Sequence, residues 1–234
     1  IAARHRIIIG PWGHNHSLEP TSDGKVAIGF GPESAFDASR MYRDYLDSVF
    51  HNKKQPDEPP VKIFVMGRNV WRSENEWPLA RAKTARYFLH SAGKANTLNG
   101  DGRLDANAPA DEPADHFTYD PNDPVPTRGG NHSVGPWNPV YRPIIWCGPC
   151  DQTPNEKRND VLVYTGDALA EDLEVTGPVA LRFHASSSAP YTDFVAKLVD
   201  VHPDGKAINI TEGVDRKSTR LNSSHANISY AVFC

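Results

Sequence analysis

The feature that most constrains the fold of this sequence is a short apolar run that stops abruptly at residue 10. Residues 7–17 read IIIGPWGHNHS, so three β-branched residues lead directly into Gly10 and Pro11. A continuous apolar run bounded by Gly-Pro is typical of a short buried strand, and buried parallel strands belong to α/β proteins. Polar residues just beyond the carboxyl ends of such strands form the active sites of these folds. His14 is therefore a candidate catalytic base, although its position alone fits an ordinary loop histidine equally well.

A helix pattern and a second strand pattern follow this run. Apolar residues recur at spacings of three and four from Ala38 to Phe50, with charged residues between them. This periodicity predicts an amphipathic helix over residues 35–52 that packs on one side. Residues 61–66 (VKIFVM), closed by Gly67, predict the second strand. Strand, helix and strand in this order predict a crossover onto a parallel sheet, which we interpret as the last part of an α/β domain.

The pattern changes after a polar loop predicted over residues 67–78, whose Trp71 and Trp77 we expect to staple a domain junction. A domain boundary is predicted between Leu79 and Ala85. Beyond it, short apolar runs alternate with Gly, Pro and Asp turns, which indicates an antiparallel β-sandwich. The predicted strands are residues 87–89, 116–119, 161–164, 179–184, 194–201 and 207–210. His202 to Gly205 has the Asp-Gly and Pro content of a hairpin turn.

Composition narrows the class of protein. The chain has 234 residues, a formal net charge of -4 and 38% hydrophobic residues, which suits one large domain or two modest ones. No apolar run approaches the roughly 20 residues that span a bilayer, so no membrane partner is predicted. The mildly acidic balance argues against nucleic acid as a partner. The chain begins at Ile1 without a leader, so we expect the start to be internal to a longer protein, and no compartment is indicated.

Several motifs occur in an order that resembles one family. They are GPWGH (10–14), VMGRNVWR (65–72), EWPL (76–79), YDPNDPVPTRGG (119–130), EDLEVTGPV (171–179) and TDFVAKLVDVHPDGKAI (192–208). As a set they resemble the CocE/NonD hydrolases, the group that includes bacterial cocaine esterase, α-amino acid ester hydrolases and X-Pro dipeptidyl-peptidases. The resemblance covers most of residues 1–214, and none of the motifs would be convincing alone.

The resemblance implies a fold of the α/β plus β class. Residues 1–80 would be the C-terminal part of an α/β-hydrolase catalytic domain, and residues 81–214 an incomplete C-terminal jelly-roll β-sandwich. It also implies a Ser-His-Asp triad that cleaves ester, amide or peptide bonds through an acyl-enzyme, with His14 as the triad histidine. The chemistry agrees, because a serine hydroxyl needs a base within hydrogen-bond reach and histidine has a suitable pKa.

The other triad members are not expected in this chain. In α/β-hydrolases the order is serine, acid, histidine, and no G-x-S-x-G motif is present. We therefore expect a C-terminal fragment that is inactive alone. The acyl pocket of the family lies between the two domains, so Trp12, Trp137 and Trp146 are candidates for lining it. The predicted partner is a small ester, amide or peptide substrate. No cofactor or metal is predicted, and homo-oligomerisation of the full-length protein is left open.

Two alternatives remain. The chain could be a β-sandwich binding or accessory module without catalytic activity. Residues 146–150 spell WCGPC, which is the thioredoxin redox motif, but no amphipathic helix pattern follows it. A Cys147–Cys150 link, or two plain thiols, is the favoured interpretation. The pair also falls short of a zinc site, since a second pair of ligands is absent.

The last twenty residues depart from the family pattern. Residues 215–234 read DRKSTRLNSSHANISYAVFC. A common sequencing adapter, translated in one frame, encodes DRKSTRLNSSH and then ISYAVFC, and Ala226-Asn227 fills the place of its barcode. We therefore interpret residues 215–234 as translated adapter from a metagenomic read, and expect no functional residue among them.

Overall fold

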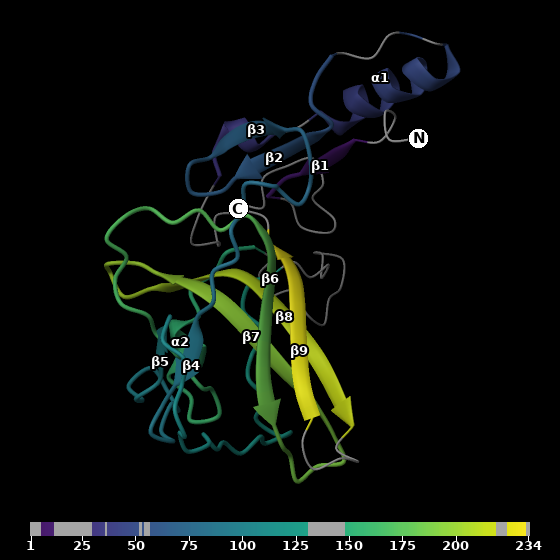
Figure 1. Ribbon diagram of the computed structural model, residues 1–234. Helices are drawn as coiled ribbons and strands as arrows, with labels where there is room; N and C mark the ends of the chain where they lie inside the picture. The colour runs from purple at the N-terminus through teal and green to yellow at the C-terminus, as the bar shows by residue number, and fades with distance from the viewer. Residues whose placement is uncertain are drawn as a thin grey trace.

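The chain folds into a small sheet with one helix and a larger set of long strands. The computed structural model describes residues 6–11, 30–35, 37–51, 53, 57–130, 148–218 and 224–232. Its elements are β1 (Ile7–Ile9), η2 (Pro32–Ser34), α1 (Ala38–Phe50), β2 (Val61–Val65), β3 (Val70–Glu74), β4 (Phe88–His90), β5 (Arg103–Asp105), α2 (Thr153–Glu156), β6 (Gly177–Ala185), β7 (Tyr191–Val201), β8 (Ala207–Ser218) and β9 (Ser224–Val232). In Figure 1 the β1–β3 sheet and α1 lie at one end, and β6–β9 with β4, β5 and α2 lie at the other.

The first sheet has the order β1-β2-β3. β1 runs parallel to β2, with Ile8 opposite Lys62, which confirms the predicted parallel pair on either side of a helix. The middle strand β2 is covered on both faces, and Ile63 and Phe64 are each only 1% exposed. Burial on both faces explains why β2 reads as a nearly continuous apolar run rather than an alternating one.

The third strand of this sheet lies where the sequence predicted a loop. β3 pairs antiparallel with β2, and Trp71 stands opposite Phe64. The predicted loop is therefore wrong over residues 70–74: a polar segment becomes a strand because it completes the hydrogen bonds of β2. Trp77 packs against the buried cluster of Val61, Ile63, Val65 and Leu79. The two tryptophans thus pack on this sheet, one on β2 and one beside the start of the connection to the β-sandwich.

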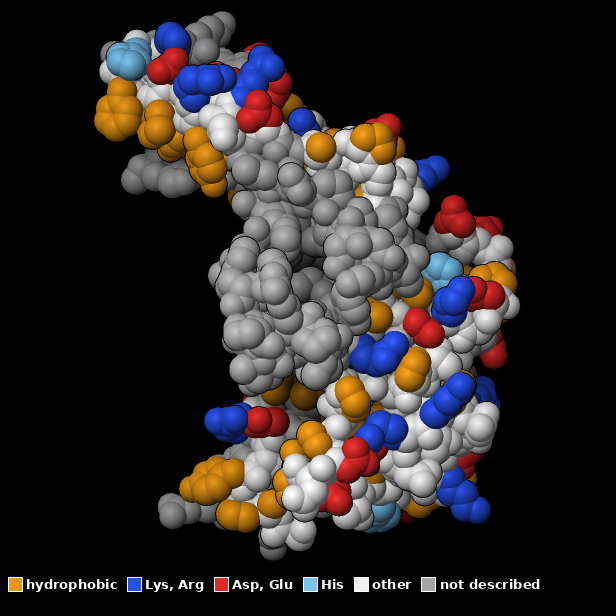
Figure 2. Space-filling model, turned by 180° about the vertical axis from the view of Figure 1, so that it is seen from behind, with side chains coloured by type: hydrophobic (Ala, Val, Ile, Leu, Met, Phe, Trp, Pro, Cys, Tyr) orange, Lys and Arg blue, Asp and Glu red, His pale blue; other side chains and the backbone are white. Residues whose placement is uncertain are grey.

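The predicted helix is confirmed, but its predicted packing is wrong. α1 begins after Asp37, whose carboxylate accepts a hydrogen bond from the Arg40 backbone N–H at 2.8 Å. Four large side chains of its apolar face are exposed: Tyr42 by 61%, Tyr45 by 38%, Leu46 by 48% and Phe50 by 72%. Figure 2 shows hydrophobic side chains in a row along one side of α1 and charged ones along the other. No helix in the described part of the chain is long and apolar enough to cross a membrane.

The long strands form two antiparallel pairs, β6 with β9 and β7 with β8. Exposure alternates along β6 and the first half of β7, and the rings of Phe183 and Phe194 meet edge to face at 5.5 Å between centroids. The β7–β8 turn is closed by a hydrogen bond from the His202 N–H to the Lys206 carbonyl, and Gly205 takes the positive φ that such a turn requires. The predicted β-sandwich and hairpin are confirmed here.

Other predictions for this part are wrong. Residues 116–119 form no strand, and residues 161–164 contribute one isolated bridge, between Leu162 and Asn96. β5, near Leu104, was not predicted.

The final stretch is built into the sandwich. β8 extends to Ser218, and β9 pairs along the whole of β6. A strand ladder is made by backbone N–H and C=O groups, which every residue except proline carries. The pairing therefore does not depend on the origin of residues 215–234, and their interpretation as translated adapter stays a prediction.

Candidate functional site

The predicted site residues His14, Trp12, Trp137 and Trp146 lie outside the described residues. The structure describes instead the elements that precede and follow the two segments carrying them. The first segment leaves β1 through Gly10 and Pro11 and rejoins the described chain at Phe30. The second lies between Gly130 and Gly148.

Aromatic packing fixes the point where the first segment returns. Phe30 is 2% exposed, and its ring meets that of Phe64 edge to face at 6.1 Å. Phe64 in turn meets Trp71 at 5.3 Å. The Trp71 indole N–H donates to the Glu33 carbonyl at 2.8 Å, and Glu33 belongs to η2. The chain after residue 29 is thereby held on one face of β2 and β3.

The opposite face of β3 carries an ion network that reaches the β-sandwich. The Arg72 guanidinium donates two hydrogen bonds to the Glu174 carboxylate, at 2.7 and 2.8 Å. Its Nε lies 2.6 Å from the carboxylate of Glu74, which also accepts both terminal nitrogens of Arg81. Glu174 lies three residues before β6, so the network joins the first sheet to the sandwich.

The charges of this network hold both carboxylates ionised. The hydrogen bonds from Arg72 lower the pKa of Glu174 to about 2, assisted by the Thr176 hydroxyl. The hydrogen bonds from Arg81, with a smaller contribution from Arg72, lower the pKa of Glu74, although burial of that carboxyl acts in the opposite direction. Bidentate arginine–carboxylate pairs fix orientation as well as distance. The network is therefore suited to holding the two parts of the molecule at one angle.

A second set of contacts joins the ends of the segment between Gly130 and Gly148. These two residues exchange backbone hydrogen bonds of 2.9 and 2.7 Å. Asn209 on β8 accepts the Cys150 N–H at 2.7 Å, and the Gln152 side-chain amide donates to the Arg128 carbonyl at 2.9 Å. Asn209 and Gln152 are 5% and 2% exposed. This buried polar cluster stabilises the base of the segment that contains Trp137 and Trp146.

Close backbone approach at this base explains a glycine of the YDPNDPVPTRGG motif. Gly129 has a φ of +63°, and a Cβ there would lie 2.5 Å from the Gly148 carbonyl oxygen and 2.6 Å from Oδ1 of Asn209. Any larger residue would separate the two ends. Asn209 also belongs to an Asn-X-Thr sequence, but its burial and its hydrogen bonds exclude it as a glycan acceptor in the folded chain.

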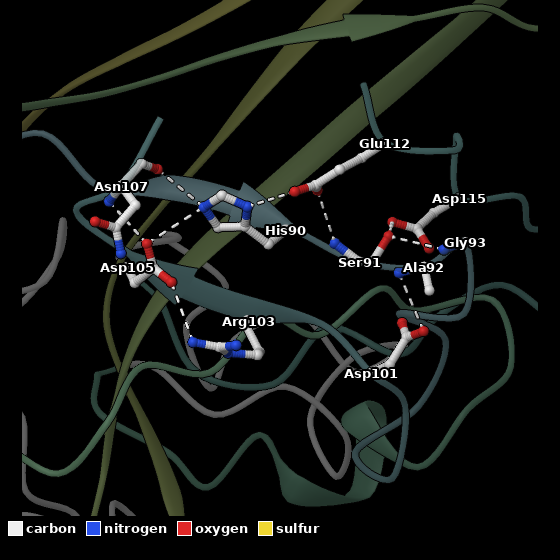
Figure 3. Close-up of polar contacts among 10 residues, drawn as sticks. All are labelled: His90, Ser91, Ala92, Gly93, Asp101, Arg103, Asp105, Asn107, Glu112 and Asp115. Atoms are coloured by element: carbon white, nitrogen blue, oxygen red, sulfur yellow. Dashed lines mark hydrogen bonds and ion pairs between the residues drawn. The ribbon is translucent and has the colours of Figure 1, made fainter. Parts of the chain in front are cut away.

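The structure also brings together a cluster that the sequence did not predict (Figure 3). The ring of His90, on β4, lies with Nδ1 2.7 Å from a carboxylate oxygen of Glu112 and Nε2 3.0 Å from the Asn107 carbonyl. Asp105 on β5 approaches Nε2 at 3.3 Å, and the His90 side chain is 15% exposed. No spacing rule relates residues that are 15 to 22 positions apart, so no sequence signal could have found the cluster.

The cluster around His90 is neither a nucleophile–base pair nor a metal site. The neighbouring Ser91 hydroxyl donates to Asp115 at 2.7 Å rather than to His90. No group of three metal-ligating side chains is found among the residues that the structure places. A catalytic serine must reach its base directly, so this cluster cannot supply that pair.

Comparisons with known proteins agree with the family motifs. Residues 52–227 match the X-Pro dipeptidyl-peptidase C-terminal non-catalytic domain. The chain is 38% identical over 219 residues to the cocaine esterase of Rhodococcus sp., and the alignment covers 92% of this chain and 36% of that protein. It is 30% identical over 232 residues to a putative serine esterase of Mycobacterium bovis, covering 95% of this chain and 31% of that protein.

The chain belongs to the CocE/NonD and X-Pro peptidase family of hydrolases. It spans about a third of the length of the curated relatives it matches. The fold is also similar to that of a crystallised aminopeptidase from the marine sediment archaeon Thaumarchaeota archaeon, with a TM-score of 0.66 and 22% identity, over 97% of this chain and 39% of that one.

In this family context, the thioredoxin-like motif can be placed. Cys150 is a buried free thiol, and Cys147 lies outside the described residues. The helix nearest to the motif is α2, which begins at Thr153 and is four residues long. The motif therefore does not open the long helix that lowers a thiol pKa in redox proteins of the thioredoxin type.

One groove on the family domain is lined by charges that are already paired. It has a volume of about 580 Å³ and includes Phe117 and Arg158. Arg158 donates to both carboxylate oxygens of Asp160 at 2.8 Å and to the Asp123 carbonyl at 2.6 Å. The guanidinium thus fastens the YDPNDP turn to the segment after α2, which is a structural role.

Proposed function

We propose that this chain is part of a serine hydrolase that cleaves ester, amide or peptide bonds through an acyl-enzyme, with His14 as the general base. The observation that carries the proposal is the place of GPWGH, directly after β1 and its parallel pairing with β2. The carboxyl end of a parallel strand is where α/β enzymes present catalytic side chains. The esterase names of two relatives support the same reaction class.

The mechanism assigns one proton path to His14. A serine hydroxyl attacks the substrate carbonyl while the neutral imidazole of His14 accepts its proton. The resulting imidazolium then donates that proton to the leaving alcohol or amine, which leaves an acyl-serine. A water molecule, deprotonated by the same imidazole, releases the acid product and restores the serine. We expect the serine, and the carboxylate that orients His14, in polypeptide that precedes Ile1 in the family's order.

The remaining residues are assigned a supporting role. The domain that residues 52–227 match is described as non-catalytic, which favours chemistry contributed by residues before it. The Arg72–Glu174 pair and the buried Asn209 cluster would hold the sandwich and its loop in a fixed position beside the reacting groups. Trp12, Trp137 and Trp146 are proposed to line the pocket for a small ester, amide or peptide substrate. No cofactor is needed for this reaction.

The test compares two histidines of one loop in the full-length enzyme. His14→Ala should lower kcat/KM for p-nitrophenyl acetate by a factor on the order of 10⁴, because that is the usual cost of losing a triad member. His16→Ala should leave the rate within a few-fold of the parent. If His14→Ala stayed within tenfold of the parent, the assignment of the base would be wrong.

Two further arms separate the alternatives. Xaa-Pro p-nitroanilides test whether peptide bonds are cleaved as well as esters. The isolated 234-residue chain should show no turnover, and turnover that His14→Ala abolished would place the nucleophile inside the chain. A full-length protein that cleaves neither substrate would favour the accessory-module interpretation.

A further inference from the structure

The histidine of the Figure 3 cluster has an arrangement that only one protonation state satisfies. Nδ1 of His90 faces the Glu112 carboxylate at 2.7 Å, and Nε2 faces the Asn107 carbonyl at 3.0 Å. A carbonyl and an ionised carboxylate only accept hydrogen bonds, whereas a neutral imidazole has one N–H and one lone pair. Both contacts are hydrogen bonds only when the ring is protonated. In the neutral ring, one of the two oxygens would face a lone pair.

The charged groups around the ring favour the protonated form. Glu112 approaches from the segment after β5, and Asp105 approaches from β5 itself. The one cation among them, Arg103, lies 3.2 Å from the far oxygen of Asp105 and is 68% exposed. The hydrogen bond to Glu112 raises the pKa of His90 above its ordinary value, with the Asn107 carbonyl and Asp105 acting in the same direction and burial against it. The same hydrogen bond lowers the pKa of Glu112.

The two acceptors of His90 belong to a segment with little other attachment. Residues 106–114 form no helix or strand, and all of them are exposed. Asn107 and Glu112 meet the ring from this segment, and Glu112 also accepts the Ser91 backbone N–H at 3.1 Å. The segment is fixed beyond this point by Asp115, which accepts the Ala95 N–H and the Tyr164 hydroxyl at 2.8 and 2.7 Å. Asp115 makes no contact with His90 among these hydrogen bonds, so its anchor does not require a charged imidazole.

We propose that His90 is a pH-dependent clasp that holds residues 106–112 against β4 when its ring is protonated and releases them when the ring loses its proton. Release ends at Asp115, whose hydrogen bonds persist. The clasp is closed on the acid side and opens as the pH rises through the His90 titration. It would make the surface around β4 and β5 respond to alkaline pH without unfolding the sandwich. It does not depend on the proposed hydrolase activity.

The experiment follows the ring and the segment separately in the purified 234-residue chain. NMR of the imidazole gives the titration midpoint of His90. Amide hydrogen exchange between pH 6 and pH 9, corrected for the intrinsic rate, gives the protection of Ser91 and of residues 106–112. Protection should fall about tenfold for each pH unit above the His90 midpoint, as expected for coupling to one proton. Protection of Ala95, held by Asp115, should stay constant.

Three variants make the test decisive. His90→Gln removes the charge, and it should abolish the protection at every pH. Glu112→Gln keeps the size of the side chain but removes its charge, and it should lower the His90 midpoint and weaken the clasp at lower pH. His116→Gln replaces an exposed histidine near the same segment, and it should behave as the parent. The proposal would be overturned by protection that ignores the His90 midpoint, or by a midpoint that Glu112→Gln does not move. A misfolded His90→Gln leaves the Glu112→Gln arm to decide.

Discussion

β2 and α1 are both apolar segments of the first part of the chain, but the described structure buries only one of them. Phe64 on β2 is 1% exposed, packed between Phe30 and Trp71. Phe50 on α1 is 72% exposed, and its neighbours on the apolar face are exposed with it. Apolar periodicity therefore predicts an element and the face that seeks burial, but not the surface that covers this face. Burial, and with it most of the stabilising free energy, depends on residues far away in sequence.

The largest expected effect separates these two phenylalanines. Phe64→Ala should lower the free energy of unfolding by about 3–5 kcal/mol, because it removes a buried ring and leaves a cavity. Phe50→Ala should change it by less than about 0.5 kcal/mol, since most of the ring already contacts solvent. Urea unfolding of the purified chain, followed by tryptophan fluorescence, measures both. Equal losses in the two variants would show that the face of α1 is covered in solution, and would remove the contrast.

The sequence predicted local elements well and long-range partners poorly. β1, β2, α1, β6, β7 and the His202–Gly205 turn could be predicted because apolar periodicity and turn residues act over a few positions. β3 could not, because Val70 to Glu74 is polar on one face, where its charges meet Glu174 and Arg81. Strands predicted at 116–119 and 161–164 fail because these runs find no partner strand for a ladder among the described residues.

The sites divide in the same way. His14 was accessible to sequence reasoning because GPWGH is a local motif, and its role stays a prediction. The His90 cluster was not accessible, since its acceptors come from three separate segments. The same holds for the Asn209 cluster, in which a strand residue closes a loop 59 positions earlier at Cys150.

A middle-sized effect tests whether charge can replace apolar burial as a link between the two parts. Glu74→Gln should cost about 2 kcal/mol at pH 7, because hydrogen bonds from the Arg72 and Arg81 guanidinium groups lose their charged acceptor. The folded-state pKa values of Glu74 and Glu174 lie below the ordinary 4.5, so their contribution is full above that value and is lost as the pH falls.

The pH dependence supplies the control for that variant. The difference in unfolding free energy between the parent and Glu74→Gln should be constant from pH 7 to about pH 5 and shrink toward pH 2, where Glu174 also titrates. Urea unfolding at several pH values measures it. Glu171→Gln, an exposed carboxylate on the segment before Glu174, should show little difference at any pH. A cost that did not vary with pH would mean that packing, not charge, is lost in Glu74→Gln.

The smallest effect concerns the start of α1 and asks whether this helix unfolds together with the sheet. Asp37 accepts the Arg40 N–H at 2.8 Å, and replacing such a cap with alanine costs a helix about 1 kcal/mol. An unpacked helix of 13 residues is only marginally stable in water. Asp37→Ala should therefore raise amide exchange within α1 by about fivefold, while the melting temperature of the chain stays unchanged because β2 and β3 do not rest on the helix. Exchange and melting are measured on the same sample, with Asp44→Ala as a control that leaves the cap intact. A melting temperature that fell along with the helix protection would place α1 inside the cooperative unit and would mean that its apolar face is buried in solution.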